Sequence, residues 1–307
     1  MTVTKEAISD WRQTLKTEHA HLEAHFFSHP NTPSLLKNLS LSIDRLLVAV
    51  WQAFQLDASI CLIAVGGYGR QTLFPYSDID LLILLPERST ADQQTKIEQL
   101  IGVLWDIGLN VGHSVRTPSE CLDEAQRDVT ILTNLIESRL LTGPQKQFQR
   151  FQLDVNQLLA PAAFLEKKLK EQQNRHAKFN DTAYNLEPNL KESPGGLRDL
   201  NMIVWIAQSQ GWGKTWAELR KNNIISDKEL RQIKRHELNL QTLRVRLHYL
   251  ARRREDRLLF DFQNTLATDL GLTTTPHKRA SEQQAVYAQA KIFKQTGRIR
   301  VAKKMRF

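Results

Sequence analysis

Residues 62–85 of this 307-residue chain, reading LIAVGGYGRQTLFPYSDIDLLILL, constrain its fold more than any other stretch. Two short apolar runs suit two buried strands, and a glycine-rich turn with a polar connector joins them. The second strand starts at Asp78 and Asp80, which project to one face because side chains alternate along a strand. An unpartnered buried carboxylate is costly, so we expect a cation to meet this acidic face.

The carboxylates and the glycines beside them suit complementary ligands. Carboxylate oxygens are ligands that Mg²⁺ prefers, and Mg²⁺ often shares them with substrate phosphates. Gly66, Gly67 and Gly69 permit positive φ angles and let bare backbone N–H groups approach a phosphate. The stretch therefore predicts a phosphate cradle next to a Mg²⁺ site.

Length and composition are those of a globular protein of about two domains, with 41% hydrophobic and 24% charged residues. No apolar run reaches the roughly 18 to 20 residues that span a bilayer, and the N-terminus has no signal-peptide pattern. We therefore expect a cytoplasmic protein without a membrane partner. Cys61 and Cys121 form no metal-binding or disulfide pattern and are expected to be buried thiols.

The net charge of +9 is concentrated at the C-terminal end of the chain. Residues 276–307 hold nine Lys or Arg and one acidic residue, which gives 9 − 1 = +8 and leaves about +1 for the first 275 residues. We expect this basic tail to be poorly ordered. Because nucleic-acid binders usually carry a basic face, we expect no specific nucleic-acid partner.

Apolar periodicity divides the rest of the chain into an α/β part and a helical part. Thr117 and Glu120 have the spacing of a capping box, and Pro118 stands at the first helical position, so a helix is predicted to start there. The chain thus predicts a small mixed sheet with flanking helices, followed by a mainly helical domain. Expected strands cover 59–65, 79–85 and 110–116; expected helices cover 4–23, 34–54, 91–108, 128–141, 145–159, 162–179, 200–210, 214–222 and 227–254.

We predict N-terminal helices over 1–55, a catalytic α/β domain over 56–145, a helical domain over 146–275 and the tail over 276–307. A cleft between the α/β and helical domains is expected to hold the substrate. The loop 184–199, which contains Lys191 and Arg198, is either a linker or a loop that lines this site. We take Lys191 and Arg198 as candidate phosphate contacts.

An apolar residue, Gly-Gly, a spacer and Asp-x-Asp on a strand resemble the nucleotidyltransferase superfamily with its polymerase beta-like fold. More narrowly, the chain resembles the bacterial bifunctional uridylyltransferase/uridylyl-removing enzyme family over roughly residues 60–265. The motifs that carry this resemblance, in order, are GGYGRQTLFPYSDIDLLIL, VGHSVRT, DVTILTNLIESRLLTG, YNLEPNLKESPGGLRDL and RLLFDFQ.

The resemblance implies transfer of UMP from UTP to a tyrosine hydroxyl of the nitrogen-regulatory protein PII, with release of pyrophosphate. It makes Gly66 and Gly67 the loop that holds the UTP triphosphate, and it makes Asp78 and Asp80 the catalytic Mg²⁺ ligands. Arg70 either contacts a phosphate just past the glycines or forms an ion pair within the protein. The preference for uracil over adenine as the base of the nucleotide rests on the resemblance alone.

The sequence departs from the family pattern in three ways. The strand 110–116 lacks the third carboxylate of many superfamily members, and four residues could supply it: Asp106, Glu137, Glu187 or Asp199. The His-Asp phosphohydrolase domain and the ACT modules are absent, so we expect a truncated chain without uridylyl-removing activity or glutamine sensing. After about Lys278 the sequence no longer predicts an amphipathic helix, which suggests a truncated or frame-shifted end.

Two alternatives to a PII uridylyltransferase stay open. One is an adenylyltransferase-type enzyme with another acceptor, because the Asp-x-Asp chemistry would be the same. The other is a folded but catalytically inactive fragment.

Overall fold

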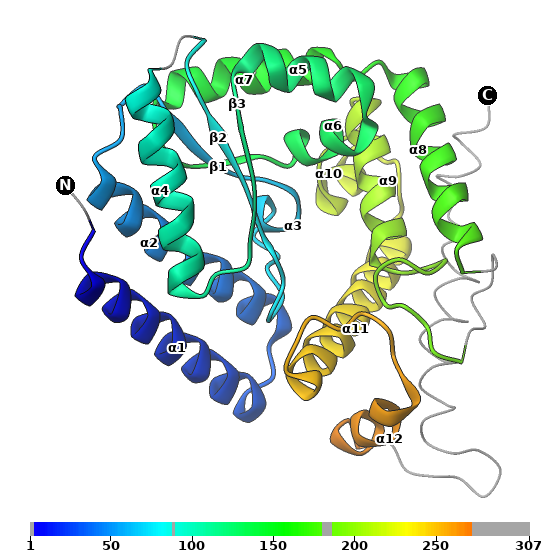
Figure 1. The fold of residues 1–307 in the computed structure, drawn as a ribbon. Helices are drawn as coiled ribbons and strands as arrows, with labels where there is room; N and C mark the ends of the chain where they lie inside the picture. The colour runs from blue at the N-terminus through cyan, green and yellow to red at the C-terminus, as the bar shows by residue number, and fades with distance from the viewer. Residues whose placement is uncertain (1–2, 88–89, 180–185, 272–307) are drawn as a thin grey trace, which may run out of the picture. The chain divides into compact units, whose positions relative to one another are not determined.

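A computed structural model describes residues 3–87, 90–179 and 186–271 of the chain. Two compact units, one ending at Leu159 and the other beginning at Ala160, make up the fold (Figure 1). The basic tail 276–307 and residues Tyr184 and Asn185 of the predicted site loop lie outside the described residues. The four-part domain division stays a prediction.

The first unit contains a four-stranded mixed sheet in the order β3-β2-β1-β4. β1 is antiparallel to both β2 and β4, whereas β2 and β3 are parallel. The predicted α/β class with a small mixed sheet is therefore confirmed. The strands are β1 (Cys61–Ala64), β2 (Ile79–Leu84), β3 (Val111–Arg116) and β4 (Arg139–Thr142).

Helices surround this sheet, and apolar stripes on them supply the core. α1 packs against α2 and α4, and α5 packs against α6 and α7 (Figure 1). A capping box starts α5 at Thr117, as the sequence predicts. The helices are α1 (Lys5–Ser28), α2 (Thr32–Phe54), α4 (Ala91–Ile107), α5 (Pro118–Arg127), α6 (Val129–Ile136) and α7 (Gln145–Gln157).

The predicted helix over 128–141 is wrong in its second half. Asp128 does cap α6, but the helix ends at Ile136 and residues Arg139–Thr142 form β4. Pairing with β1 outweighs the local apolar pattern, because Leu140 lies opposite Ile63 in the sheet. This strand is too short for its period to be read from the sequence.

The glycine-rich turn also differs from its prediction. Residues Gly66–Gly69 form one helical turn, α3, and only Gly66 among its glycines has a positive φ, at +57°. Gly69 is needed for a different reason: a Cβ on it would lie 2.1 Å from the Glu137 carbonyl oxygen and 2.9 Å from that of Ala64. The turn therefore packs directly on neighbouring backbone.

The second unit is helical over its described residues, apart from one isolated bridge between Asn189 and Arg257. α9 begins at Leu197, three residues before its prediction, and α12 is not predicted at all. The helices are α8 (Pro161–Ala177), α9 (Leu197–Ser209), α10 (Trp216–Lys221), α11 (Asp227–Ala251) and α12 (Phe260–Asp269).

Two sequence-based expectations about single features can be checked directly. Cys61 and Cys121 are buried free thiols, as predicted, and burial raises the pKa of Cys61 to about 11. In the described part of the chain, no helix is both long enough and apolar enough to cross a bilayer.

Candidate functional site

Antiparallel pairing brings the glycine turn and the aspartates together. β1 leads into the turn and β2 starts beside it, since Ala64 at the end of β1 pairs with Leu81 near the start of β2. The Val65 N–H donates to the Asp80 carbonyl oxygen at 3.1 Å. The sheet therefore places Gly66 next to Asp80, as the sequence motif requires.

Two glycines leave room around the Asp80 carboxylate. A Cβ on Gly66 would lie 3.5 Å from Asp80 Oδ2, and a Cβ on Gly112 would lie 3.0 Å from Oδ1. Gly112 faces Asp80 across the β2–β3 pair. Any other residue at either position would occupy the space beside this carboxylate, so the site fits an added cation with its own ligands.

Asp78 stands just before β2 on the same side as Asp80. Both aspartates are half-buried and Ile79 between them is buried, which is the alternation expected of a strand. The Asn110 side-chain amide donates to Asp78 Oδ1. Within the described ranges no three His, Cys, Asp or Glu residues are grouped so as to hold a metal ion. A cation on Asp78 and Asp80 would therefore complete its coordination with water or substrate oxygens.

Arg70 follows the turn and forms the ion pair that the sequence left as one of its two options. Its guanidinium pairs with the carboxylate of Glu137, whose side chain is only 6% exposed. Arg70 Nη2 would lie 3.7 Å from a Cβ on Gly67, so the guanidinium also borders the turn. A phosphate contact by Arg70 and a metal-binding role for Glu137 stay predictions.

Sequence reasoning missed several residues that shape this site. Asn110 contacts Asp78, Gly112 faces Asp80, and Asn134 lies beside Gly66. Asp44 and Arg139 hold the turn from α2 and β4. Gly112 carried a signal, because glycine inside a strand often marks a close approach by another group.

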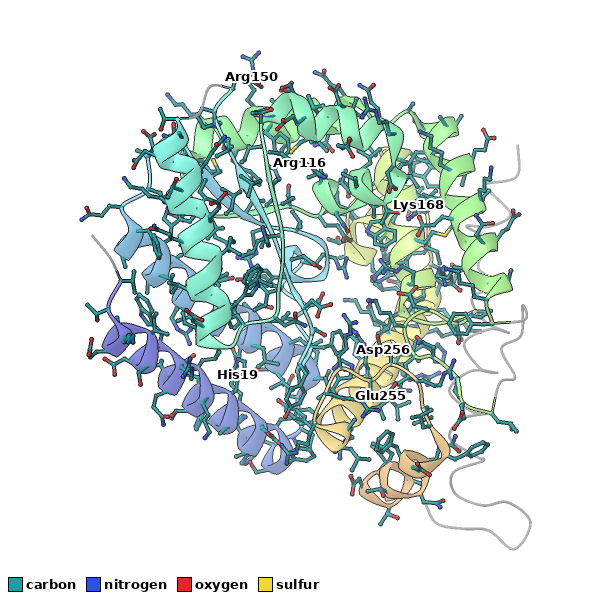
Figure 2. All side chains as sticks on the ribbon, in the orientation of Figure 1. His19, Arg116, Arg150, Lys168, Glu255 and Asp256 are labelled. Carbon is teal, nitrogen blue, oxygen red and sulfur yellow. The ribbon has the colours of Figure 1, made fainter. Side chains whose placement is uncertain are left out.

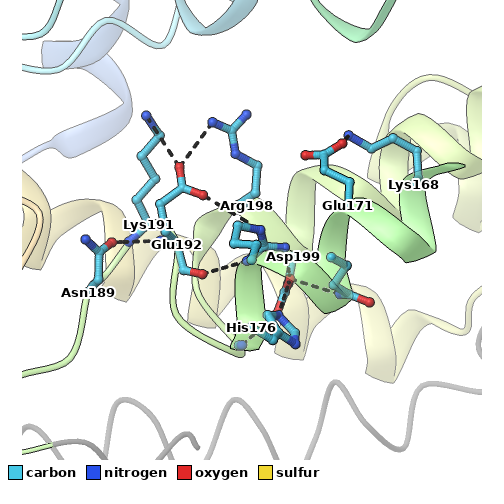
Figure 3. Close-up of polar contacts among 11 residues, drawn as sticks. Lys168, Glu171, His176, Asn189, Lys191, Glu192, Arg198 and Asp199 are labelled. Carbon is cyan, nitrogen blue, oxygen red and sulfur yellow. Dashed lines mark hydrogen bonds and ion pairs between the residues drawn. The ribbon is translucent and has the colours of Figure 1, made fainter. Parts of the chain in front are cut away.

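The second unit brings Lys191 and Arg198 together around one carboxylate. Figure 3 shows both side chains converging on Glu192, with Lys191 Nζ at 3.7 Å and Arg198 Nη2 at 3.1 Å from its Oε1. Gly196 makes this arrangement possible, since a Cβ on it would lie 2.8 Å from the Lys191 carbonyl oxygen. Burial lowers the pKa of Lys191, and the charges of Arg244 and Arg198 lower it further.

Asp199, a candidate third carboxylate, is held by groups of its own unit. It accepts from His176 Nε2 at 3.1 Å, from Gln172 at 3.0 Å and from the Gly195 N–H at 2.7 Å, and it pairs with Arg175. Burial opposes its ionisation, but His176 and Arg175 outweigh burial and lower its pKa to about 2.

The other candidates are likewise in defined places. The Glu187 carboxylate accepts from the Phe260 N–H at 2.9 Å, and Asp106 is an exposed residue of α4.

The second unit also contains a buried lysine. Lys168 points from α8 toward α9 (Figure 2), where its Nζ lies 4.5 Å from the centre of the Trp205 ring. Cation–π contact and a pair with Glu171 thus hold this buried lysine.

Each part of the chain matches a described protein family. Residues 44–137 match the family described as Nucleotidyltransferase domain, and this range contains the turn, both aspartates and Gly112. Residues 163–300 match the family described as GlnD PII-uridylyltransferase. The second match includes residues 276–300 of the basic tail, which weakens the hypothesis of a frame shift after about Lys278.

Three bacterial relatives, each named bifunctional uridylyltransferase/uridylyl-removing enzyme, match nearly all of the chain. The protein of Nitrosospira multiformis is 48% identical over 277 residues, which are 88% of this chain and 31% of the relative. The protein of Chromobacterium violaceum is 48% identical over 92% of this chain and 33% of the relative. The protein of Aromatoleum aromaticum is 45% identical over 95% of this chain and 34% of the relative.

The chain spans about a third of the length of the curated relatives it matches. Over that third, the sequence similarity includes the glycine turn and the Asp-x-Asp strand within a nucleotidyltransferase domain. Over nearly all of its length, the chain is therefore similar to part of the bifunctional uridylyltransferase/uridylyl-removing enzymes.

Proposed function

We propose that this chain transfers UMP from UTP to a tyrosine hydroxyl of the PII signal protein and releases pyrophosphate. The observation that carries this proposal is the placement of the Gly66 turn against the Asp80 carboxylate, with Gly112 keeping the carboxylate accessible. The name of the relatives supports a uridylyl group as the group transferred, and the description of the family that matches residues 163–300 supports PII as the acceptor.

In the proposed reaction the tyrosine hydroxyl loses its proton to solvent and its oxygen attacks the α-phosphorus of UTP. The bond from that phosphorus to the bridging oxygen of the β-phosphate breaks, and pyrophosphate leaves. Asp78 and Asp80 would hold Mg²⁺. When bound there, Mg²⁺ would offset the charge of the phosphates and of the leaving pyrophosphate. The backbone of Gly66 and Gly67 would orient the triphosphate, and such positioning lowers the barrier to reaction.

Cationic side chains would add to nucleotide binding. Arg70 borders Gly67, so a phosphate at the turn would compete with Glu137 for its guanidinium. We propose that Lys191 and Arg198 bind a phosphate group, because three cations, counting Arg175, share the single carboxylate of Glu192 and the Lys191 and Arg198 side chains are partly exposed. Cytoplasmic location belongs to the same proposal, since PII and UTP are intracellular molecules.

The proposal is tested by incubating the chain with α-labelled UTP, Mg²⁺ and purified PII. Label on PII with UTP, and little with ATP, is the expected result. A preference for ATP would indicate an adenylyltransferase-type activity. Nucleotide binding without transfer to PII would indicate an inactive fragment and contradict the proposal.

Asp80→Ala tests the site itself. Loss of a ligand that acts in the transition state should lower transfer more than about 1000-fold, whereas the melting temperature should stay near that of the wild type because Asp80 is only half-buried. Asp92→Ala is the matched control, since Asp92 is an exposed residue of α4 paired with Lys96. Retained transfer in Asp80→Ala would remove Asp80 from the metal site.

A further inference from the structure

A charged cluster holds the glycine turn, and one of its members, Asp44, lies outside all the sequence motifs named above. Arg139, the first residue of β4, places its guanidinium on both oxygens of Asp44, with Nη1 at 2.8 Å from Oδ2 and Nη2 at 3.0 Å from Oδ1. Asp44 belongs to α2. This fork-to-fork pair ties a helix to a strand across 95 residues of sequence.

The same guanidinium also binds the backbone of the turn. Arg139 Nε donates to the Gly69 carbonyl oxygen at 3.3 Å, and Nη2 approaches the Tyr68 carbonyl oxygen at 3.4 Å. Tyr68 closes the cluster, because its hydroxyl donates to Asp44 Oδ1 at 2.6 Å and its ring lies under the guanidinium. All three nitrogens of the arginine head group therefore contact the turn or the Asp44 carboxylate.

A purely stabilising role explains this cluster poorly. A largely buried ion pair often contributes no more to stability than well-packed apolar residues would, because both charges lose their water. A satisfied polar cluster instead fixes one geometry. Here that geometry belongs to residues Gly66–Gly69, and Gly66 at the start of this turn lies beside Asp80.

We propose that Arg139 and Asp44 form a clamp that positions the glycine turn for nucleotide binding. They are positioning residues, since Arg139 contacts the turn through the Tyr68 and Gly69 carbonyl oxygens, whereas the backbone N–H groups of the turn are the groups proposed to hold the triphosphate. The inference rests on the proposed nucleotidyl transfer. Arg139 should set how well the turn binds the triphosphate, and hence kcat/KM for UTP, without altering the KM for PII.

The test compares Arg139→Lys with the wild type in the full chain. Lysine keeps the charge but cannot form the fork, so amide hydrogen exchange in residues 61–73 should rise several-fold. The Kd for UTP with Mg²⁺, and kcat/KM for UTP, should worsen about 10- to 100-fold, because small misplacements of a binding element have effects of that size. The melting temperature should fall by only about 4 °C or less.

Two controls separate positioning from general stability. Arg45→Gln removes the neighbouring surface pair of α2 with Glu18 and should leave exchange and kinetics unchanged. Arg244→Lys disturbs a buried arginine–carboxylate fork with Asp256 in the second unit, so it should lower the melting temperature without faster exchange in residues 61–73. If Arg139→Lys does not fold, Tyr68→Phe tests the clamp instead, because it removes the hydrogen bond from the Tyr68 hydroxyl to Asp44. We then expect about threefold faster amide hydrogen exchange in the turn.

The outcomes distinguish the clamp from the proposed function. Wild-type exchange and an unchanged Kd in a folded Arg139→Lys, or in Tyr68→Phe where it is needed, would overturn the clamp while transfer by the wild type stands. A wild-type chain that neither binds UTP nor modifies PII would overturn the proposed function. Hydrogen exchange would then decide by itself whether Arg139 orders the turn.

Discussion

Asp80 in the first unit and Asp199 in the second are both aspartates in the interior of a fold, yet their surroundings differ in kind. Asp80 sits between Gly66 and Gly112, two residues without side chains. Asp199 sits among Arg175, His176 and Gln172, which all reach its oxygens. Glycine backbone borders Asp80 on two sides, whereas charged and polar side chains surround the Asp199 carboxylate.

We propose that this difference separates a site that receives a ligand from a carboxylate that holds the fold. A carboxylate held by cations of its own chain gains little from another cation. A carboxylate bordered by glycines can accept an ion that arrives with its own oxygen ligands. The comparison predicts that steric changes matter most near the turn and Asp80, and that changes of charge or pH matter most near Asp199.

The largest effect is expected from Gly69→Ala. Its Cβ would lie 2.1 Å from the Glu137 carbonyl oxygen and 2.9 Å from that of Ala64, and neither backbone atom can move away easily. We expect a loss of about 3 kcal/mol or more in the free energy of unfolding, measured by urea titration. Gly67→Ala is the matched control, because its nearest neighbour would be Arg70 Nη2 at 3.7 Å. Equal stability of the two variants would contradict the steric account.

Most of the first unit could be predicted from the sequence because its signals are local. The apolar runs on either side of Gly66 and Asp80 predicted two buried strands, and the capping box at Thr117 predicted a helix start to the residue. β4 could not be predicted, since four residues are too few for a period and only pairing with β1 makes them a strand.

The site was predictable only where chemistry is concentrated in one motif. Asp78, Asp80 and Gly66 lie within fifteen residues, whereas the Asp44 carboxylate and the Arg139 guanidinium meet only because α2 and β4 pack together. Lys191 and Arg198 were predictable as a charged loop, but their shared partner Glu192 depends on the close approach at Gly196. Contacts between distant segments are set by tertiary packing, which no short pattern encodes.

The next largest effect is expected from Asp199→Asn, which removes a charge and leaves the volume of the side chain almost unchanged. The pKa of Asp199 is lowered from 3.8 to about 2 in the folded chain. Its carboxylate therefore adds stability above pH 3.8, and this contribution is lost as the pH falls toward 2. We expect the variant to lose about 2 kcal/mol at pH 7, with the difference from the wild type shrinking between pH 4 and pH 2.

Urea unfolding of both proteins across this pH range provides the measurement. Asp227→Asn is the control, because Asp227 pairs with Arg220 at the surface and should matter far less. If Asp199→Asn is as stable as the wild type at pH 7, the interaction of the Asp199 charge with His176 and Arg175 does not contribute to the free energy of unfolding. That result would contradict the claim that charge interactions at Asp199 stabilise the fold.

The smallest effect, and the sharpest test of the space around Asp80, is expected from Gly112→Ala. The new Cβ would lie 3.0 Å from Asp80 Oδ1, so the carboxylate would shift by a few tenths of an ångström. Transfer should fall about tenfold, while stability should hold or rise slightly because alanine orders a strand better than glycine. Gly102→Ala in α4, where a Cβ meets nothing within 4 Å, should leave transfer unchanged. Full activity of Gly112→Ala would mean that the glycine border is not what makes Asp80 a ligand site.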